Sequence, residues 1–491
     1  MGKIIFRNSL DVDAGADIGP TNFSLRLTYP LGVGTVPSGR PANDRARFAY
    51  PGIEYNICGA AVGGSFPYTW TLSNEPAGMT IDADTGEISW PNPTSNASNI
   101  TITVEDGASD TDSATWSIVV STSGWKFVDA TGGSDAAAGT LAAPWETIEK
   151  VHTSGGTDRI YFREGTYNLD GLTPSGSVGD THVEWNDGDG RELIWLGYPG
   201  EARPLIDLQS SGTETPYIKS DCQVLHFDHL EIANAFRYGV QDVRGDHGLV
   251  IRRCDLHGLV GGSGGLNAAL IMVSAVGDST PHACVVVQDC EFSDTPADWT
   301  QGVCTKWYYT LYLLVERTTV TNCGEGHAVK ESNAQYTLRQ NTFSGIDGQA
   351  IGGDWGDNET SHGHYGEICY NNIKDAGSDA IRINQNGDQA AGPTYIYRNT
   401  VQGIPRIFHG ATGDGPIVIQ SNVIVNDHAA EPPFPQGFAT DNAPDITVFD
   451  FGTGVTANLL ATTAAGAVDA DGVLVGAYRT SYLGTHGHEI A

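Results

Sequence analysis

The chain has 491 residues, 40% of them hydrophobic, which is enough for two or three domains with buried cores. Lys and Arg number 26 against 59 Asp and Glu, so the formal net charge is −33. Such a surface repels nucleic acids and anionic membranes, and we expect neither as a partner. The sequence has no unbroken apolar stretch of membrane-spanning length, so we also expect no membrane insertion. The acidity favours solubility at high ionic strength, as in a marine source.

The first residues carry no secretory signal that we can identify, because residues 1–7 lack an apolar stretch of useful length. We expect an extracellular or virion-associated protein whose signal was removed or whose release needs none. The eight Cys residues form no C-x-x-C motif, which gives no support for a zinc or redox site. Several occupy strand positions of the repeat described below, and we predict that they are buried thiols.

Residues 42–121 alternate apolar and polar side chains in short runs, such as 68–72 and 100–104, with turn signals between them. This pattern predicts a small antiparallel β-sandwich, preceded by an arm or small β element over residues 1–41. Residues 63–72 and 76–90 resemble the immunoglobulin-like and cadherin-like modules of bacterial surface proteins. The resemblance implies an immunoglobulin-like sandwich that acts as a spacer or, in some proteins, as a sugar binder.

A repeat of the form apolar-x-x-[Asn/Cys/Thr]-x-apolar begins near residue 227. Its fourth position, called the pivot below, recurs at positions 254, 290, 318, 341, 371, 399 and 422, with Leu230 in a looser first copy. The shortest interval, from 318 to 341, is 23 residues, which fits one coil of a parallel β-helix; longer intervals then contain loops. We therefore predict an all-β chain in which a right-handed parallel β-helix over residues 122–440 follows the sandwich. Asn at the pivot favours a left-handed bend and a ladder of hydrogen-bonded side chains.

Both ends of the predicted β-helix resemble those of pectate-lyase-like proteins. Residues 127–135 and 159–167 are similar to the first coil of such proteins, and residues 145–151 to its capping helix. Residues 468–478 are similar to their closing strands, so we expect a C-terminal cap over residues 441–491. A solenoid end needs a cap because it exposes an apolar cross-section and unpaired strand edges.

Polar residues between about 320 and 385 form the candidate site. Alternation places Val329, Ile351 and Ile381 inside the solenoid, which predicts an outward column of Lys330, Gly352 and Arg382. The predicted catalytic residues are Lys330, Arg382 and His327. The predicted sugar-binding side chains are Trp355, Trp307, Tyr308 and His364. The predicted metal ligands are Glu325, Asp354, Asp357 and Glu359.

Two chemistries fit these residue types. β-Elimination on a uronic-acid polysaccharide needs a base for the C5 proton and a cation that neutralises the C5 carboxylate. Lys330 could be the base, and Arg382 or bound Ca²⁺ could be the cation. Glycoside hydrolysis instead needs two carboxylates. These would come from Asp354, Asp357, Glu359 and Glu331.

Residues 325–333 are similar to the lysine segment of the chondroitinase B and alginate lyase family. The resemblance implies that Lys330 is the base and that Glu325, five positions earlier, binds calcium. That family places its arginine one coil after the lysine. This chain has Gly352 at that place and its arginine, Arg382, two coils later.

Taken together, these features predict a carbohydrate-active β-helix protein, first of all a polysaccharide lyase that acts on a uronic-acid-containing polysaccharide with Ca²⁺ as a candidate cofactor. One alternative is a non-catalytic protein that binds glycans at a surface or as a tailspike-like phage component. The other alternative is a glycoside hydrolase. Both a monomer and a trimer are compatible with the sequence.

Overall fold

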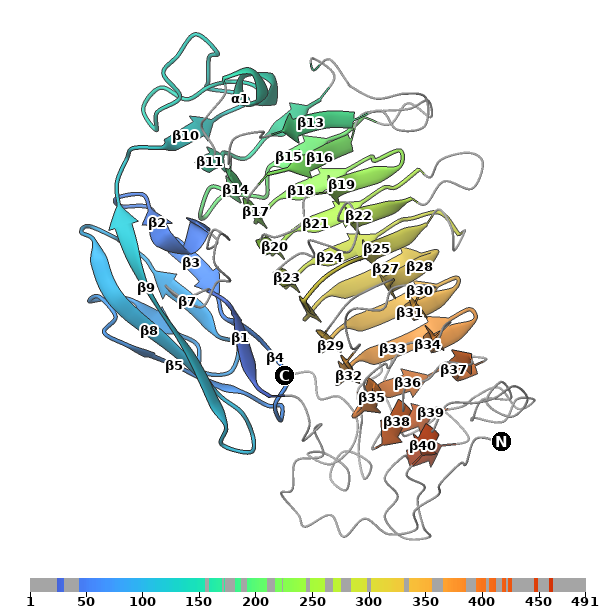
Figure 1. The fold of residues 1–491 in the computed structure, drawn as a ribbon. Helices are drawn as coiled ribbons and strands as arrows, with labels where there is room; N and C mark the ends of the chain where they lie inside the picture. Colours follow the sequence, from blue (N-terminus) through green and yellow to red (C-terminus); the bar gives the residue numbers. More distant parts are fainter. Residues whose placement is uncertain are drawn as a thin grey trace. The chain divides into compact units, whose positions relative to one another are not determined.

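The computed structural model describes part of the chain and divides it into two compact units. The described residues are 24–30, 44–154, 159–169, 172, 182–186, 192–209, 217–222, 224–243, 248–260, 268–274, 284–297, 302–330, 335–355, 365–385, 394–402, 406–411, 417–420, 423–425, 446–448 and 459–461. The N-terminal unit comprises residues 17–256 and 274–290, and the C-terminal unit comprises residues 1–16, 257–273 and 291–491. Almost all their elements are strands (Figure 1). Among the described helices, none is long and apolar enough to cross a membrane.

A β-sandwich forms the first part of the N-terminal unit. One sheet has the order β2 (Phe48–Ala49), β9 (Thr111–Val120), β8 (Ala97–Glu105), β5 (Thr69–Ser73), and the other β3 (Tyr55–Cys58), β7 (Glu87–Trp90), β6 (Thr80–Ile81). A short 3-10 helix, η1 (Asp44–Arg47), precedes β2. In β9, Ala114, Trp116 and Ile118 are buried and alternate with exposed residues, as the sequence pattern predicts. Strand β1 (Arg26–Tyr29) pairs with β4 (Ala60–Val62), so this part of the predicted arm belongs to the sandwich.

The rest of the N-terminal unit consists of coils of a parallel β-helix, and each full coil contributes one strand to each of three parallel sheets. Sheet 1 contains β10 (Trp125–Val128), β11 (Arg159–Phe162), β14 (Glu192–Gly197), β17 (Val224–Asp228), β20 (Gly248–Arg252) and β23 (Cys284–Gln288). Sheet 2 contains β12 (Thr166–Asn168), β15 (Leu205–Asp207), β18 (Glu231–Ala233) and β21 (Asp255–His257). Sheet 3 contains β13 (His182–Asn186), β16 (Tyr217–Asp221) and β19 (Tyr238–Asp242).

The C-terminal unit has the same three-sheet arrangement. Sheet 1 contains β26 (Tyr312–Glu316), β29 (Gln335–Arg339), β32 (Tyr365–Cys369), β35 (Thr394–Tyr397), β38 (Ile417–Gln420) and β40 (Ile446–Val448). Sheet 2 contains β24 (Glu291–Ser293), β27 (Thr319–Cys323), β30 (Thr342–Ile346), β33 (Asn372–Ala376), β36 (Thr400–Gln402), β39 (Val423–Val425) and β41 (Leu459–Ala461). Sheet 3 contains β22 (Ala269–Val273), β25 (Val303–Trp307), β28 (Glu325–Val329), β31 (Gln349–Trp355), β34 (Asp379–Gln385) and β37 (Arg406–Ala411).

The predicted repeat corresponds to the corner between sheets 1 and 2. The first corner residue has a positive φ, as at Arg317 (52°) and Tyr370 (56°), and the second corner residue is the pivot. The left-handed bend therefore lies one residue before the position that the sequence indicated. The predicted side-chain ladder is confirmed, because Nδ2 of Asn341 donates to Oδ1 of Asn371 at 3.0 Å and Nδ2 of Asn371 to Oδ1 of Asn399 at 2.9 Å.

Replacing Asn371 with alanine is expected to destabilise the C-terminal unit by about 3 kcal/mol. Its amide also donates to the Leu338 carbonyl at 3.0 Å and accepts from the Asn341 N–H at 3.0 Å, and all these groups are buried. Urea denaturation followed by circular dichroism measures the change. The same substitution at exposed Asn168 is the control and should cost less than about 0.5 kcal/mol. Equal effects of the two substitutions would contradict a contribution of the Asn ladder to stability.

At both ends of the described solenoid, the residue ranges of the elements differ from those predicted from the sequence. The capping helix is α1 (Ile148–Thr153), and Oγ1 of its N-cap residue Thr147 accepts a hydrogen bond from the Lys150 N–H at 3.1 Å. At the other end, β40 and β41 pair in parallel with β38 and β39, so the coils continue past the predicted boundary at residue 440. Residues 468–478, expected to close the cap, lie outside the described residues. All eight Cys residues are buried free thiols, as predicted.

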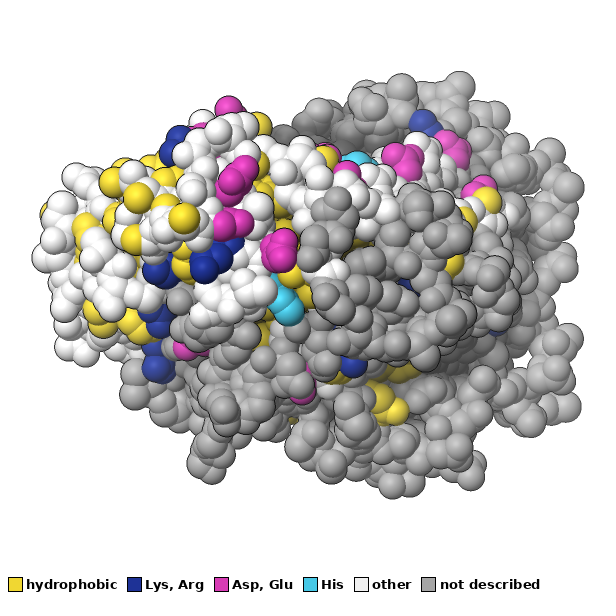
Figure 2. Space-filling view, turned by 90° about the horizontal axis from the view of Figure 1, so that it is seen from above, with side chains coloured by type: hydrophobic (Ala, Val, Ile, Leu, Met, Phe, Trp, Pro, Cys, Tyr) yellow, Lys and Arg dark blue, Asp and Glu magenta, His cyan; other side chains and the backbone are white. Residues whose placement is uncertain are grey.

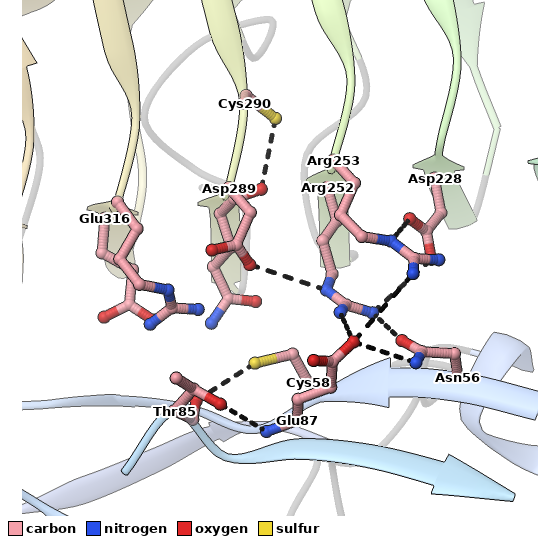
Figure 3. A network of polar contacts seen from close by, with 12 residues as sticks. Asn56, Cys58, Thr85, Glu87, Asp228, Arg252, Arg253, Asp289, Cys290 and Glu316 are labelled. Carbon is pink, nitrogen blue, oxygen red and sulfur yellow. Dashed lines mark hydrogen bonds and ion pairs between the residues drawn. The ribbon is translucent and has the colours of Figure 1, made fainter. Parts of the chain in front are cut away.

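The sandwich packs directly on the outer side of sheet 1 within the N-terminal unit. One buried apolar cluster joins Ile53 of the sandwich to Trp125, Phe127, Tyr161, Ile194, Leu196 and Val224 of the solenoid. Beside it, Arg252 of β20 donates through Nη1 to Oδ1 of Asn56 at 2.6 Å and through Nη2 to Oε1 of Glu87 at 3.0 Å (Figure 3). This docking argues against the spacer role that the resemblance implies.

Candidate functional site

The candidate site lies on the outer face of sheet 3 in the C-terminal unit. Successive side chains of a strand point to opposite faces, and the inward positions are settled by His327, which is fully buried. His327 is in register with Thr305, Ile351 and, one coil further, Ile381. The positions that directly follow these residues on each strand therefore face outward.

The outward column beside His327 consists of Lys306, Ala328, Gly352 and Arg382, which are in register on β25, β28, β31 and β34. The predicted column of Lys330, Gly352 and Arg382 is therefore wrong by two residues at its first member. Lys306 is only 2% exposed, whereas Arg382 is half-buried. Strand spacing places the Cα atoms of these two cations roughly 14 Å apart, with two small residues between them.

Lys330 follows β28 directly, and its N–H donates to the Trp307 carbonyl at 2.8 Å. Because Val329 is in register with Gly353, Lys330 lies next to the backbone of Asp354 rather than that of Gly352. Its Cα is then roughly 12 Å from that of Arg382, two coils away and two residues along the strand. Lys330 is half-buried, so both long side chains border the same small-residue floor.

Two polar side chains lie over Gly352. A Cβ atom at this position would collide with Oε1 of Glu325 and lie 2.7 Å from Oε1 of Gln349. Any larger residue would displace them, so glycine allows a carboxylate and an amide to lie flat across the sheet. Glu325 and Gln349 are both buried. Gln349 is in register with Asp379, which is also buried, and these polar groups form the edge of the floor.

His327 does not belong to this surface, which corrects its predicted catalytic role. Its Nδ1 lies 2.8 Å from Oγ1 of Thr305 and its Nε2 lies 2.9 Å from Oγ1 of Thr318. Its ring contacts the edges of Phe292 and Phe343, with centroids 5.7 and 5.3 Å away. Burial lowers the pKa of His327 to about 3, so the neutral ring is a packed member of the core.

This burial predicts a pH dependence of stability. The pKa of His327 is about 3 in the folded chain and that of His226, lowered by burial, is also about 3, against an ordinary value near 6.5. Below about pH 6.5 the unfolded chain binds protons that the folded chain does not, so each histidine lowers stability by about 1.4 kcal/mol per pH unit down to about pH 3. Urea denaturation between pH 7 and 4 should show a smaller slope in His327→Gln than in the native chain. Identical slopes of stability against pH in the two proteins would contradict the lowered pKa of His327.

The predicted sugar-stacking residues are placed differently. Trp307 is in register with Val329 on the inward side and is fully buried, so its ring offers no face to a ligand and this prediction is wrong. Tyr308 is half-buried beside Tyr309, with ring centroids 6.3 Å apart, and remains a candidate. Of Trp355 the structure describes the backbone in β31 alone, and His364 lies outside the described residues.

The predicted calcium site cannot be assembled from what the structure describes. Asp354 is placed by its backbone alone, and Asp357 and Glu359 lie outside the described residues. Elsewhere in the described part of the chain, no three His, Cys, Asp or Glu side chains gather as metal ligands would. Glu325, the ligand implied by the family resemblance, lies over Gly352 as an oxygen donor of the type that calcium takes.

The sequence reasoning did not find three residues of this surface, which are Lys306, Gln349 and Asp379. The signal for Lys306 was available, because residues 303–307 alternate as the later strands do. Extending the coil alignment one strand back would have placed Lys306 in the column. Gln349 and Asp379 begin their strands, where turn residues and strand residues are hard to tell apart by pattern.

Comparisons with known proteins give distant similarities to solved structures and one family match. Among solved structures, the chain is similar to the GH136 lacto-N-biosidase from Eubacterium ramulus, with 10% identity over 69% of this chain and 67% of that chain and a TM-score of 0.33. It is similar to a rhamnogalacturonan lyase, with 12% identity over 66% and 86% and a TM-score of 0.35. It is also similar to tailspike protein 3 of bacteriophage CBA120, with 14% identity over 69% and 62% and a TM-score of 0.32.

A comparison with curated protein sequences gives no match. Residues 33–121 match the family model described as "Putative Ig domain", which confirms the immunoglobulin-like sandwich. The three parallel sheets that follow confirm the β-helix. The chain therefore consists of an Ig-like domain followed by a parallel β-helix.

Proposed function

We propose that this chain is an extracellular or virion-associated, carbohydrate-active protein that binds a uronic-acid polysaccharide on the outer face of sheet 3 and cleaves it by β-elimination. The observation that carries the proposal is the floor of Ala328 and Gly352, bordered by Arg382 and Lys330. Side-chain oxygens of Glu325 and Gln349 lie over Gly352, and the two cations lie at the border of this floor, two coils and two residues apart.

Each cation has a distinct task in this proposal. The guanidinium of Arg382 pairs with the C5 carboxylate and makes the C5 proton more acidic. The amine of Lys330 removes that proton, the electron pair forms the C4–C5 double bond, and the glycosidic oxygen leaves from C4 and takes up a proton from the protonated Lys330 or from water. Because the chain carries a net charge of −33, attraction of a polyanion depends on such local cations, among which Lys306 is a buried third. Calcium held by Glu325 would add positive charge at the same edge.

The direct test is the ultraviolet absorbance of unsaturated uronic acids during incubation with alginate, pectate, chondroitin or ulvan. Growth of the absorbance on at least one of them is expected, with the same assay in EDTA and in added Ca²⁺ testing the metal. No unsaturated product from any of the four would overturn the lyase proposal.

A glycoside hydrolase is the second candidate, and one observation favours it. Gln349 is in register with Asp379. His327 is in register with Ile351, and Glu325 and Gln349 each lie two residues before this pair, so Glu325 is level with Gln349. Glu325 and Asp379 thus lie two coils apart at the start of their strands in sheet 3, with roughly 10 Å between their Cα atoms. Side chains at this spacing can bring their carboxyl groups to the roughly 6.5–9.5 Å that a general acid and a general base with a water between them need. New reducing ends without unsaturated product, lost in Glu325→Gln, would select this candidate.

A further inference from the structure

A polar cleft lies between the Ig-like domain and the solenoid within the N-terminal unit, whereas the face discussed above belongs to the C-terminal unit. Its walls include Glu54 and Asn56 from the sandwich and Asp228, His229 and Arg253 from the solenoid. It encloses about 120 Å³ and is partly open to solvent, a size that limits it to a small ligand. Junctions between domains are a common place for such sites.

Both walls of the cleft are fixed before any ligand arrives. Asp228 is 3% exposed and accepts from Arg253 through two bonds, Nε to Oδ1 at 2.7 Å and Nη2 to Oδ2 at 2.9 Å. Asn56 donates to Glu87 at 2.9 Å and accepts from Arg252 at 2.6 Å (Figure 3). The same contacts dock the sandwich on the solenoid, so a ligand does not have to order the walls.

The charges that line the cleft cancel. The lining contains two carboxylates, of Glu54 and Asp228, and two guanidinium groups, of Arg45 and Arg253, so the positive and negative charges are equal in number. Basic and acidic side chains also lie close together, rather than in separate fields, on the face seen in Figure 2. An ion would therefore meet as much repulsion as attraction in this cleft. A neutral ligand with many hydroxyl groups fits better, because each hydroxyl can donate to a carboxylate or amide oxygen and accept from a guanidinium.

From this geometry we propose that the cleft is a second saccharide-binding site, which takes a neutral sugar residue. The Ig-like domain and the first coils form it together, and neither forms it alone. The site is independent of cleavage at sheet 3. It would hold a neutral part of a glycan against the N-terminal unit.

Two glycines provide a matched pair of variants. Gly200 lines the cleft, has a φ of +82°, and a Cβ placed on it would meet nothing within 4 Å. Gly78, in a turn of the sandwich, has a φ of +84° and equally open space, but is not part of the cleft. Asparagine tolerates this backbone conformation better than other side chains do, so Gly200→Asn adds a side chain to the lining of the cleft with little strain and Gly78→Asn is its control.

Isothermal titration calorimetry of the full chain with cellotriose, maltotriose, mannotriose and lactose tests the proposal. At least one of them should bind, with equal affinity in Gly78→Asn, and about tenfold or more weaker in Gly200→Asn. Glu54→Gln should also weaken binding, because it replaces one acceptor by a donor.

The proposal is overturned if none of the four sugars binds, or if Gly200→Asn binds as tightly as Gly78→Asn. It is also overturned if trigalacturonate alone binds in a way that Gly200→Asn removes. Repeating the titration in Lys330→Ala separates this site from the proposed lyase face. Neutral-sugar binding must survive there whether or not the native chain cleaves any polysaccharide.

Discussion

Replacing Lys330 with alanine is expected to lower the rate of unsaturated-product formation by about 10²- to 10⁴-fold, the usual contribution of a general base. The side chain borders the floor of Ala328 and Gly352 and contributes no inward packing, so the fold should be unchanged. The initial rate of ultraviolet absorbance on the cleaved polysaccharide measures the effect. Arg382→Ala should act differently, by raising KM as well as lowering kcat, since it loses carboxylate binding.

The matched control for Lys330 is Lys374→Ala. Lys374 is a half-buried lysine on β33 of sheet 2, in register with Ser344, and therefore faces another side of the solenoid. It should keep the native rate. If Lys330→Ala keeps more than about half of that rate too, Lys330 is not the base. If it loses all activity together with its circular-dichroism spectrum, Arg382→Lys decides, because it keeps the charge but removes the paired guanidinium bonds.

Replacing Arg252 with alanine is expected to destabilise the N-terminal unit by about 3–5 kcal/mol, the range for removing one partner of a buried ion pair, here Arg252 and Asp228, which lie 3.6 Å apart and are 2% and 3% exposed. Arg252 is 2% exposed and connects the solenoid to Asn56 and Glu87 of the sandwich. Its loss removes the hydrogen bond to Asn56 and one of the two cations beside Glu87 at the docking surface. Urea denaturation measures the change, and limited proteolysis should release the sandwich more readily.

Arg203→Ala is the control for Arg252. Its Nη1 lies 3.9 Å from Oδ2 of Asp255, and both side chains are 28% exposed, so this surface pair should contribute less than about 1 kcal/mol. The double variant of Arg252 and Glu87 should cost less than the sum of the two single variants. Additive costs, or an Arg252 effect no larger than that of Arg203, would mean that the bridge does not hold the sandwich in place.

Local pattern was sufficient for the architecture. The repeat around pivots such as Asn341 and Asn371 identified the coils, because a corner that recurs in every coil imposes the same residue type each time. Alternation also placed Val329, Ile351 and Ile381 on the inward side, where they are buried. The same alternation applied to Trp307 and His327 would have placed both inside, and they were assigned to the site by residue type alone.

Alternation of apolar and polar residues could not predict the register, that is, which residues of neighbouring coils lie side by side. Ala328 and Lys330, which directly follows β28, are two residues apart and so face the same side of the sheet. A shift of the register by two residues therefore leaves every inward and outward assignment unchanged. It nevertheless decides whether Lys330 or Ala328 lies beside Gly352. Loops of unequal length separate the strands, and nothing in their sequence fixes the shift. The backbone pairing of the assembled sheet fixes it and adds Lys306 to the column.

The contact between the Ig-like domain and the solenoid is the other feature that the sequence left undetermined. Arg252 is separated from Asn56 by 196 positions, and its partner could have been any of many acids in so acidic a chain. The amino-acid sequence thus specifies repeating coils and a sandwich, because short-range periodicity encodes them. Which coil residues share one floor, and which surface the sandwich covers, depend on long-range packing that no local pattern encodes.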